Sequence, residues 1–188
     1  MIDKFVAWLK NNPKLNPKSQ VNQYVNLLRM LFKENNMQVQ ISAINLMSHL
    51  SNGLKSNFAS HAKQVIPVLL DKLKEKHKAM SGTLLKVLPQ IFQNVKFEDT
   101  LDKIKESLQD KNMIKVANVI KVINKLIEEQ DKITKGGIAK KTVKTILKQL
   151  KSKDKDVREL AAQTVAMLKD KFPKQISPLT NSLSGKMQ

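Results

Sequence analysis

Positions 109 to 127 of the chain read QDKNMIKVANVIKVINKLI, a short polar turn followed by a periodic apolar segment. After the turn, apolar side chains recur at Val116, Ala117, Ile120, Ile123 and Ile127. Steps of three and four residues place these side chains on one face of an α-helix. The stretch therefore predicts a helix that starts after a turn and buries one stripe against a neighbour.

The same order of apolar helix, polar turn and second apolar helix occurs at four places. The turns are Lys33-Glu34-Asn35-Asn36, Lys74-Glu75-Lys76-His77, Gln109-Asp110-Lys111-Asn112 and Lys153-Asp154-Lys155-Asp156. Their starting positions are 41, 35 and 44 residues apart. A period of about 40 residues is typical of HEAT repeats, each of which is a pair of antiparallel helices. The sequence therefore predicts an all-α fold, a HEAT-repeat α-solenoid of about five helical hairpins.

Amphipathic segments and helix-breaking residues define the expected elements. Helices are expected at about 2–11, 18–33, 37–53, 58–75, 78–94, 97–109, 112–130, 137–151, 155–171 and 175–184. No stretch alternates with period two, so no β-sheet is expected. Gly53 suits a helix C-cap, and Pro67 is expected to kink its helix. The predicted core includes Ile44, Met47, Leu69, Leu88, Ile120, Ile123, Leu147, Val165 and Leu168.

Length and composition narrow the class of protein. The chain has 188 residues, 41% of them hydrophobic, which suits a single folded domain over 1–188. It contains no cysteine, so disulfides, thiolate metal sites and cysteine nucleophiles are excluded. The longest apolar run, at 65–70, is too short to cross a bilayer, and the N-terminus lacks the features of a signal peptide. We therefore expect a cytoplasmic domain without a membrane partner.

Residues that carry catalysis or hold metals show no recognisable pattern. The five glycines form no phosphate-binding loop. The histidines, His49, His61 and His77, are not spaced by four residues and have no acidic ligand at metal-binding spacing. The few carboxylates mostly adjoin lysines, as on solvated helix faces. We therefore expect no enzyme, no cofactor and no metal.

The strongest compositional feature is a formal net charge of +18. Such a charge implies an anionic partner, namely nucleic acid, an acidic protein surface or an anionic membrane. In a stack of hairpins the turns line up along one edge. That edge would carry Lys33, Lys74, Lys76, His77, Lys111, Lys115, Lys153, Lys155 and Arg158. The alternative is that the 34 Lys and Arg residues make every edge of the domain basic. The aromatic content of 4% disfavours binding of single-stranded nucleic acid by stacking.

Around these turns, over roughly 20–172, the sequence resembles TOG domains, the HEAT-repeat tubulin-binding domains of the microtubule-polymerase (tumour-overexpressed-gene) family. The most specific match is VIPVLLDKLKEKH at 65–77, and a second is DKDVRELA at 154–161. The segment KENNM at 33–37, followed by Gly53-Leu54 and Phe58, and KNM at 111–113 are also similar. Trp8 lacks the Lys-x-Arg that follows the family's exposed tryptophan, so we expect a shortened or divergent first repeat with Trp8 in the core.

In that family the turns inside the repeats form the edge that grips an αβ-tubulin dimer. The resemblance therefore implies contacts with tubulin or the microtubule lattice at Asn36, Met37, Lys74, Lys76, His77, Lys111, Asn112, Lys155 and Arg158. Arg158 could reach a carboxylate of the partner bidentately, or instead bridge Asp154 within its own turn. The resemblance also implies a place in the microtubule cytoskeleton, including the spindle and the centrosome or basal body.

Two hypotheses remain beside that of a monomeric tubulin-binding module of a microtubule-dynamics regulator. The first is a basic HEAT scaffold that binds nucleic acid, and the second is an adaptor that docks another protein. Lysines concentrated on the turns would favour tubulin, whereas lysines spread over helix surfaces would favour nucleic acid. An exposed apolar patch away from the turns would favour the adaptor.

Overall fold

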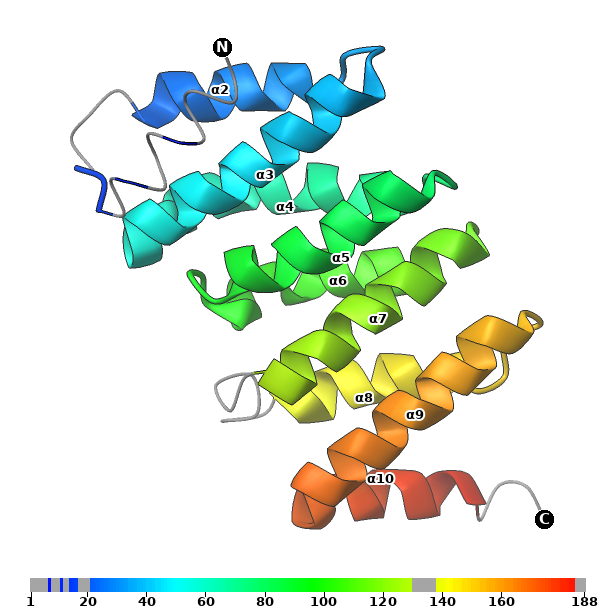
Figure 1. Cartoon of the computed structure of the whole chain (residues 1–188). Coiled ribbons are helices and arrows are strands. Elements are labelled where there is room, and N and C mark those ends of the chain that lie inside the picture. The colour runs from blue at the N-terminus through cyan, green and yellow to red at the C-terminus, as the bar shows by residue number, and fades with distance from the viewer. Residues whose placement is uncertain (1–6, 8–10, 12–13, 17–20, 130–137, 185–188) are drawn as a thin grey trace. The chain divides into compact units, whose positions relative to one another are not determined.

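The structure is a computed structural model that describes residues 7, 11, 14–16, 21–129 and 138–184. No strand occurs among these residues, and long helices dominate them (Figure 1). The chain divides into two compact units, Met1–Asp99 and Thr100–Gln188. Each unit is built from antiparallel helical hairpins. The all-α class predicted from the sequence is confirmed.

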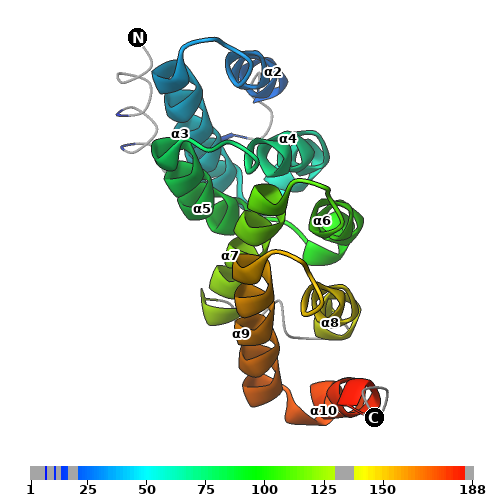
Figure 2. The same cartoon turned by 90° about the vertical axis from the view of Figure 1, so that its right-hand side faces the viewer.

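The first unit contains two hairpins. α2 (Val21–Leu31) pairs with α3 (Met37–Leu54), and α4 (Ala59–Lys72) pairs with α5 (Lys78–Phe92) after the short 3-10 helix η1 (Lys55–Phe58). α3 packs along α5 while α2 lies beside α4, which gives two layers of helices (Figure 2). The core between the layers contains fully buried aromatic and aliphatic side chains, among them Phe32, Phe58, Ile66 and Leu69.

The second unit repeats this arrangement. The 3-10 helix η2 (Phe97–Thr100) leads into α6 (Leu101–Leu108), which pairs with α7 (Met113–Glu129). α8 (Ile138–Gln149) pairs with α9 (Lys155–Lys171), and α10 (Pro173–Ser184) packs against both of them. α7 contacts α9 and α6 contacts α8, so this unit also has two layers (Figure 2).

The predicted helices agree with the observed ones to within a few residues at most ends. The expected helix at 2–11, with Trp8, lies outside the described residues. α10 starts at Pro173, two residues before the predicted start, because proline suits the first position of a helix. Pro67 lies inside α4, which continues beyond it to Lys72.

Eight of the nine predicted core residues are buried, and Val165 is the exception because it is only partly covered. The neighbouring Thr164 takes the inward position in α9. Its hydroxyl lies 2.6 Å from Oδ1 of Asn124 in α7, in a buried hydrogen bond between the two helices. This polar pair lies in the core between α7 and α9, and Val165 beside it is only partly covered.

Gly53 is not the C-cap that the sequence predicted. α3 continues to Leu54, and the left-handed backbone conformation falls on Lys55, with φ of 50°. Gly53 instead faces Leu15, whose backbone N–H donates to the Gly53 carbonyl over 3.2 Å. A Cβ at Gly53 would lie 2.8 Å from Cγ of Leu15. The glycine therefore provides the space in which residues 14–16 pack against the end of α3.

Candidate functional site

Each of the four hairpins has one turn between its two helices, and these four turns carry most of the residues that the sequence singled out. We refer to residues 32–36 as the first turn, 73–77 as the second, 109–112 as the third and 150–154 as the fourth. The first two turns belong to the first unit, and the last two belong to the second unit.

Three of the turns end in a residue that caps the following helix. Oδ1 of Asn36 accepts the N–H groups of Gln38 at 2.9 Å and Val39 at 3.2 Å. Oδ1 of Asn112 accepts from the N–H of Lys115 at 3.1 Å, and Asp154 caps α9 in the same way. Such caps satisfy N–H groups that would otherwise lack a partner in the first turn of a helix. The amide oxygens of Asn36 and Asn112 are therefore engaged, while both residues remain exposed.

In the first unit, a hydrogen-bonded bridge holds the first and second turns side by side. Gln40 in α3 donates from Nε2 to the carbonyl of Glu34, and its Oε1 accepts from Nζ of Lys72 at 2.6 Å. Arg29 in α2 also donates to Oε1 of Gln64 in α4 at 2.7 Å. The structure thus brings together five predicted site residues at one end of this unit, with Met37 half-buried and the others exposed: Asn36, Met37, Lys74, Lys76 and His77.

In the second unit, two contacts join the third and fourth turns. Nε2 of Gln149 donates to the carbonyl of Leu108 at 2.7 Å, and the hydroxyl of Ser152 lies 3.7 Å from the sulfur of Met113. Met113, the first residue of α7, thereby contacts the fourth turn. The predicted residues of this end are Lys111, Asn112 and Lys155, which are exposed, and Arg158, which is half-buried.

Arg158 has a structural role that neither sequence interpretation anticipated. Its NH1 group donates to the carbonyls of Ser152 at 2.8 Å and Lys153 at 2.9 Å. The guanidinium thus closes the fourth turn through backbone acceptors, rather than bridging the carboxylate of Asp154. Loss of Arg158 would leave these two carbonyl groups without their donor, so we expect Arg158→Ala to loosen the fourth turn.

The lysines of the turns differ in their availability. Lys74 pairs with Asp71 at 2.8 Å and Lys155 with Glu159 at 3.7 Å, in both cases at the surface. Lys115, expected on the basic edge, is instead buried, with 8% of its surface exposed, and its ammonium lies 2.8 Å from Asp110. Lys76 and Lys111 are exposed and have no ion pair within the described part of the chain. The same holds for Lys33 in the first turn and Lys153 in the fourth, so each turn offers an exposed lysine to an acidic partner.

The positive charge is not confined to the turns. Between Ile138 and Lys153 the sequence contains six lysines and no carboxylate, and Lys144, Lys148 and Lys151 are exposed. α2 has an exposed apolar stripe formed by Tyr24, Leu27 and Met30. The distribution of charge alone therefore does not select tubulin, and the apolar stripe meets the condition stated for an adaptor.

The histidines are surface or packing residues. His61 packs against the ring of Phe58 with 5.9 Å between centroids, and burial lowers the pKa of its imidazole. His77 is exposed at the end of the second turn. The described residues include no group of three or more metal-ligating side chains. A search of the described helices also finds none long and apolar enough to cross a bilayer.

The Asn36 cap can be tested by stability measurements. Asn36→Ala should lower the free energy of unfolding by about 1 kcal/mol, because two N–H groups lose their acceptor. The control is Asn35→Ala, at a neighbouring exposed position, with an expected change within about 0.5 kcal/mol. Urea unfolding followed by circular dichroism measures both. Equal stability of the two variants would show that the cap contributes nothing.

Hairpins of antiparallel helices, layered within each unit and connected by short exposed turns, define a helical-repeat protein of the HEAT type. Residues 10–188 match the family model described as CLASP N terminal, and the chain belongs to this family. The resemblance to TOG domains is thereby confirmed.

Among curated relatives, the chain is 25% identical over 155 residues to Protein mini spindles of Drosophila melanogaster. The aligned segment covers 81% of this chain and 8% of that protein. It is 28% identical over 119 residues to Phosphoprotein p93 of Schizosaccharomyces pombe, covering 62% of this chain and 14% of that protein. Zygote defective protein 9 of Caenorhabditis elegans is 28% identical over 155 residues, covering 79% and 11%. The chain therefore spans only a small part of the length of these relatives.

Solved structures show the same fold. The MAST/Orbit N-terminal domain superposes with a TM-score of 0.82 at 15% identity, covering 96% of this chain and 80% of that one. A chain from work on microtubule plus-end tracking by XMAP215, CLIP-170 and EB1 gives 0.80 at 22% identity, covering 89% and 70%. A chain from work on tubulin recruitment by polymerases with TOG domain arrays gives 0.77 at 21% identity, covering 92% and 37%.

Two residues that organise the first pair of turns, Lys72 and Gln40, carry no sequence signal that connects them. Lys72 and Gln40 are 32 positions apart in the chain and meet through their side chains. Lys72 was visible inside the segment at 65–77, but nothing in the sequence linked it to Gln40. Only the packing of α3 against the second hairpin reveals the pair.

Proposed function

We propose that this chain is a TOG domain that binds αβ-tubulin, free or in the microtubule lattice, through the four turns. The observation that carries the proposal is membership of the CLASP N-terminal family over residues 10–188. It is supported by the likeness to TOG domains described as recruiting tubulin. The role is binding without catalysis, as one module of a longer microtubule regulator in the cytoskeleton. Several such modules in series raise the effective concentration of their partner.

The residues proposed to contact tubulin fall into three groups by the availability of their side chains. Lys76, His77, Lys111 and Lys155 present exposed side chains directly to the partner. Asn36 and Asn112 are exposed and use their amide oxygens as caps, which leaves their NH₂ groups as the donors for a partner, while Met37 offers partly covered apolar surface. Lys74 would have to share its charge with Asp71, and Arg158 acts mainly by holding the fourth turn.

Electrostatics would speed the encounter and fix the orientation more than it would raise affinity. Exposed lysines on a positive domain attract an acidic surface over a distance of about one Debye length, roughly 8 Å at physiological salt. The formal charge of +18 makes this attraction general, so the specific contribution of the turns has to be separated from it.

Charge reversal at one exposed lysine of each unit distinguishes the specific contribution of the turns from the general attraction by the net charge. Lys76→Glu combined with Lys111→Glu should weaken tubulin binding by about tenfold or more, because two charged contacts are lost at about 1 kcal/mol each. Fold and stability should remain nearly unchanged, since both side chains are exposed. Size-exclusion chromatography and co-sedimentation with tubulin at low salt measure the effect.

The matched control reverses the same number of charges away from the turns. Lys86→Glu in α5 and Lys121→Glu in α7 change exposed residues near the middle of their helices, again one in each unit. Binding should weaken much less in the control. If both double variants lose affinity equally, binding is diffuse electrostatic attraction and the turns have no special role. If the unaltered domain forms no complex with tubulin, the proposal itself is refuted.

Nucleic-acid binding is a second candidate, favoured by the lysines of α8 and the residues that follow it. Lys144, Lys148 and Lys151 are exposed along a stretch with no carboxylate. Binding of this kind would depend steeply on salt and would not depend on Lys76. Reversal of the charges of Lys144, Lys148 and Lys151 should abolish oligonucleotide binding while leaving the tubulin complex intact.

A further inference from the structure

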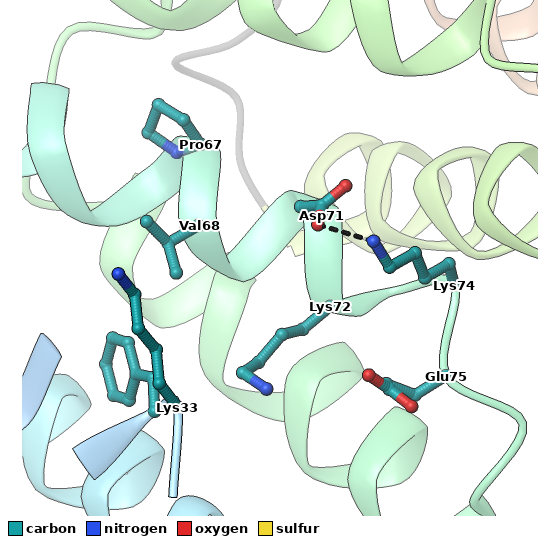
Figure 3. Close-up of a pocket in the computed structure, with 8 residues that line it drawn as sticks. Lys33, Pro67, Val68, Asp71, Lys72, Lys74 and Glu75 are labelled. Atoms are coloured by element: carbon teal, nitrogen blue, oxygen red, sulfur yellow. Dashed lines mark hydrogen bonds and ion pairs between the residues drawn. The ribbon is translucent and has the colours of Figure 1, made fainter. Parts of the chain in front are cut away.

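A groove in the first unit lies between the first turn, the second half of α4 and the second turn. Its volume of about 460 Å³ is within the size range of protein ligand pockets. Figure 3 shows its walls, which are formed by Phe32, Lys33, Pro67, Val68, Asp71, Lys72, Lys74 and Glu75. Apart from Lys74, none of these residues is among those proposed above to contact tubulin.

The groove combines an apolar wall with an uneven set of charges. Pro67 and Val68 are half-buried on the outer side of α4, next to the fully buried ring of Phe32. Three lysines and two carboxylates surround this wall, which leaves one positive charge. One additional carboxylate would therefore balance the charge of the groove.

The ammonium groups of the groove lysines differ in their partners. Lys74 has the carboxylate of Asp71 at 2.8 Å (Figure 3). The ammonium of Lys72 instead donates to a neutral amide oxygen, that of Gln40, at 2.6 Å. Burial lowers the pKa of Lys72, whereas the nearby carboxylates of Glu75 and Asp71 act in the opposite direction. The side chain of the exposed Lys33 points toward Val68 (Figure 3).

We propose that this groove receives one acidic side chain of tubulin, with its carboxylate at the ammonium groups of Lys72 and Lys33. The methylene groups of the incoming residue and its apolar neighbour would cover Pro67 and Val68. This inference rests on the proposed function and adds Lys72, which lies in α4 outside the turn residues that the sequence suggested, as a contact beside Lys33. A half-buried ammonium gains more from a carboxylate than an exposed one does, because less water competes for it.

The first test compares tubulin binding by Lys72→Gln, Lys33→Gln and the double variant. Each removes a charge but keeps a polar side chain, and the double variant should bind about tenfold more weakly. Lys72→Arg keeps the charge and should retain most of the affinity. The control is Lys63→Gln, which removes an exposed charge from the same helix, outside the groove, and should leave binding unchanged.

The second test uses carbodiimide, which joins an amine to a carboxylate in direct contact with it. Mass spectrometry of the treated complex should find Lys72 or Lys33 joined to an Asp or Glu of tubulin, and should not find Lys63. If tubulin binds but the double variant keeps full affinity and no such link forms, this inference is overturned while the proposed function stands. If the double variant loses affinity for a single-stranded oligonucleotide but not for tubulin, the groove is a phosphate site and the inference is likewise wrong.

Discussion

Asp110→Ala is expected to lower the free energy of unfolding by about 2–3 kcal/mol, because it leaves the ammonium of Lys115 buried without its carboxylate. The two groups lie 2.8 Å apart, and the side chains are 10% exposed for Lys115 and 33% for Asp110. The same carboxylate accepts the N–H of Asn112 at 2.9 Å, so the substitution also loosens the third turn.

The matched control for Asp110 is the ion pair between Lys74 and Asp71. It has the same length of 2.8 Å, but its side chains are 48% and 54% exposed. Asp71→Ala should therefore cost less than about 1 kcal/mol, since exposed ion pairs contribute little. In a second control, Asp110→Ala combined with Lys115→Met should be more stable than Asp110→Ala alone, because the buried ammonium that lost the Asp110 carboxylate is removed as well.

Urea unfolding of these variants distinguishes the two sites. Equal destabilisation by Asp110→Ala and Asp71→Ala would contradict the argument, because it would mean that burial adds nothing to the pair. Failure of Lys115→Met to restore stability would assign the loss to the backbone contact with Asn112 instead of to the charge of Lys115.

Ile120→Ala is expected to lower the free energy of unfolding by about 2–5 kcal/mol, because it removes a buried side chain and leaves a cavity. Ile120 lies in α7 with none of its surface exposed. Ile120→Val, which removes one methyl group, should cost about 0.5–1.5 kcal/mol. Lys121→Ala changes the exposed neighbour and should stay within about 0.5 kcal/mol.

Chemical denaturation of the three α7 variants measures this order directly. A cost below about 1 kcal/mol for Ile120→Ala would show that the site is loosely packed and that the burial of α7 is overstated. Since α7 follows the third turn, destabilisation there should also reduce the tubulin binding proposed above by lowering the population of folded domain.

The sequence predicted the positions of the helices well because the signals for them are local. Apolar spacing around Ile120 defines the buried face of α7 within a few turns. Asn36 and Asp154 mark helix starts because their side chains bond to N–H groups only two or three residues away. The family resemblance likewise rests on short segments at the turns, and these were sufficient to identify a TOG domain.

The sequence could not predict which of the turn side chains remain available for a partner. Lys115 and Lys111 look alike in the sequence, yet one is buried against Asp110 and the other is exposed. Arg158 looked like a surface cation, but it holds the carbonyls of Ser152 and Lys153. Burial and partner choice depend on the three-dimensional position of each group, which the residue type does not specify.

The sequence by itself therefore determined the helical class, the places of the turns and the family, since periodicity, capping and short motifs act over a few residues. Only the tertiary structure decided that Thr164 pairs with Asn124, because the two residues are 40 positions apart in the chain. It also decided that Lys72 meets Gln40 and lines a groove with Lys33. Such contacts arise only when distant helices pack, so no local pattern contains them.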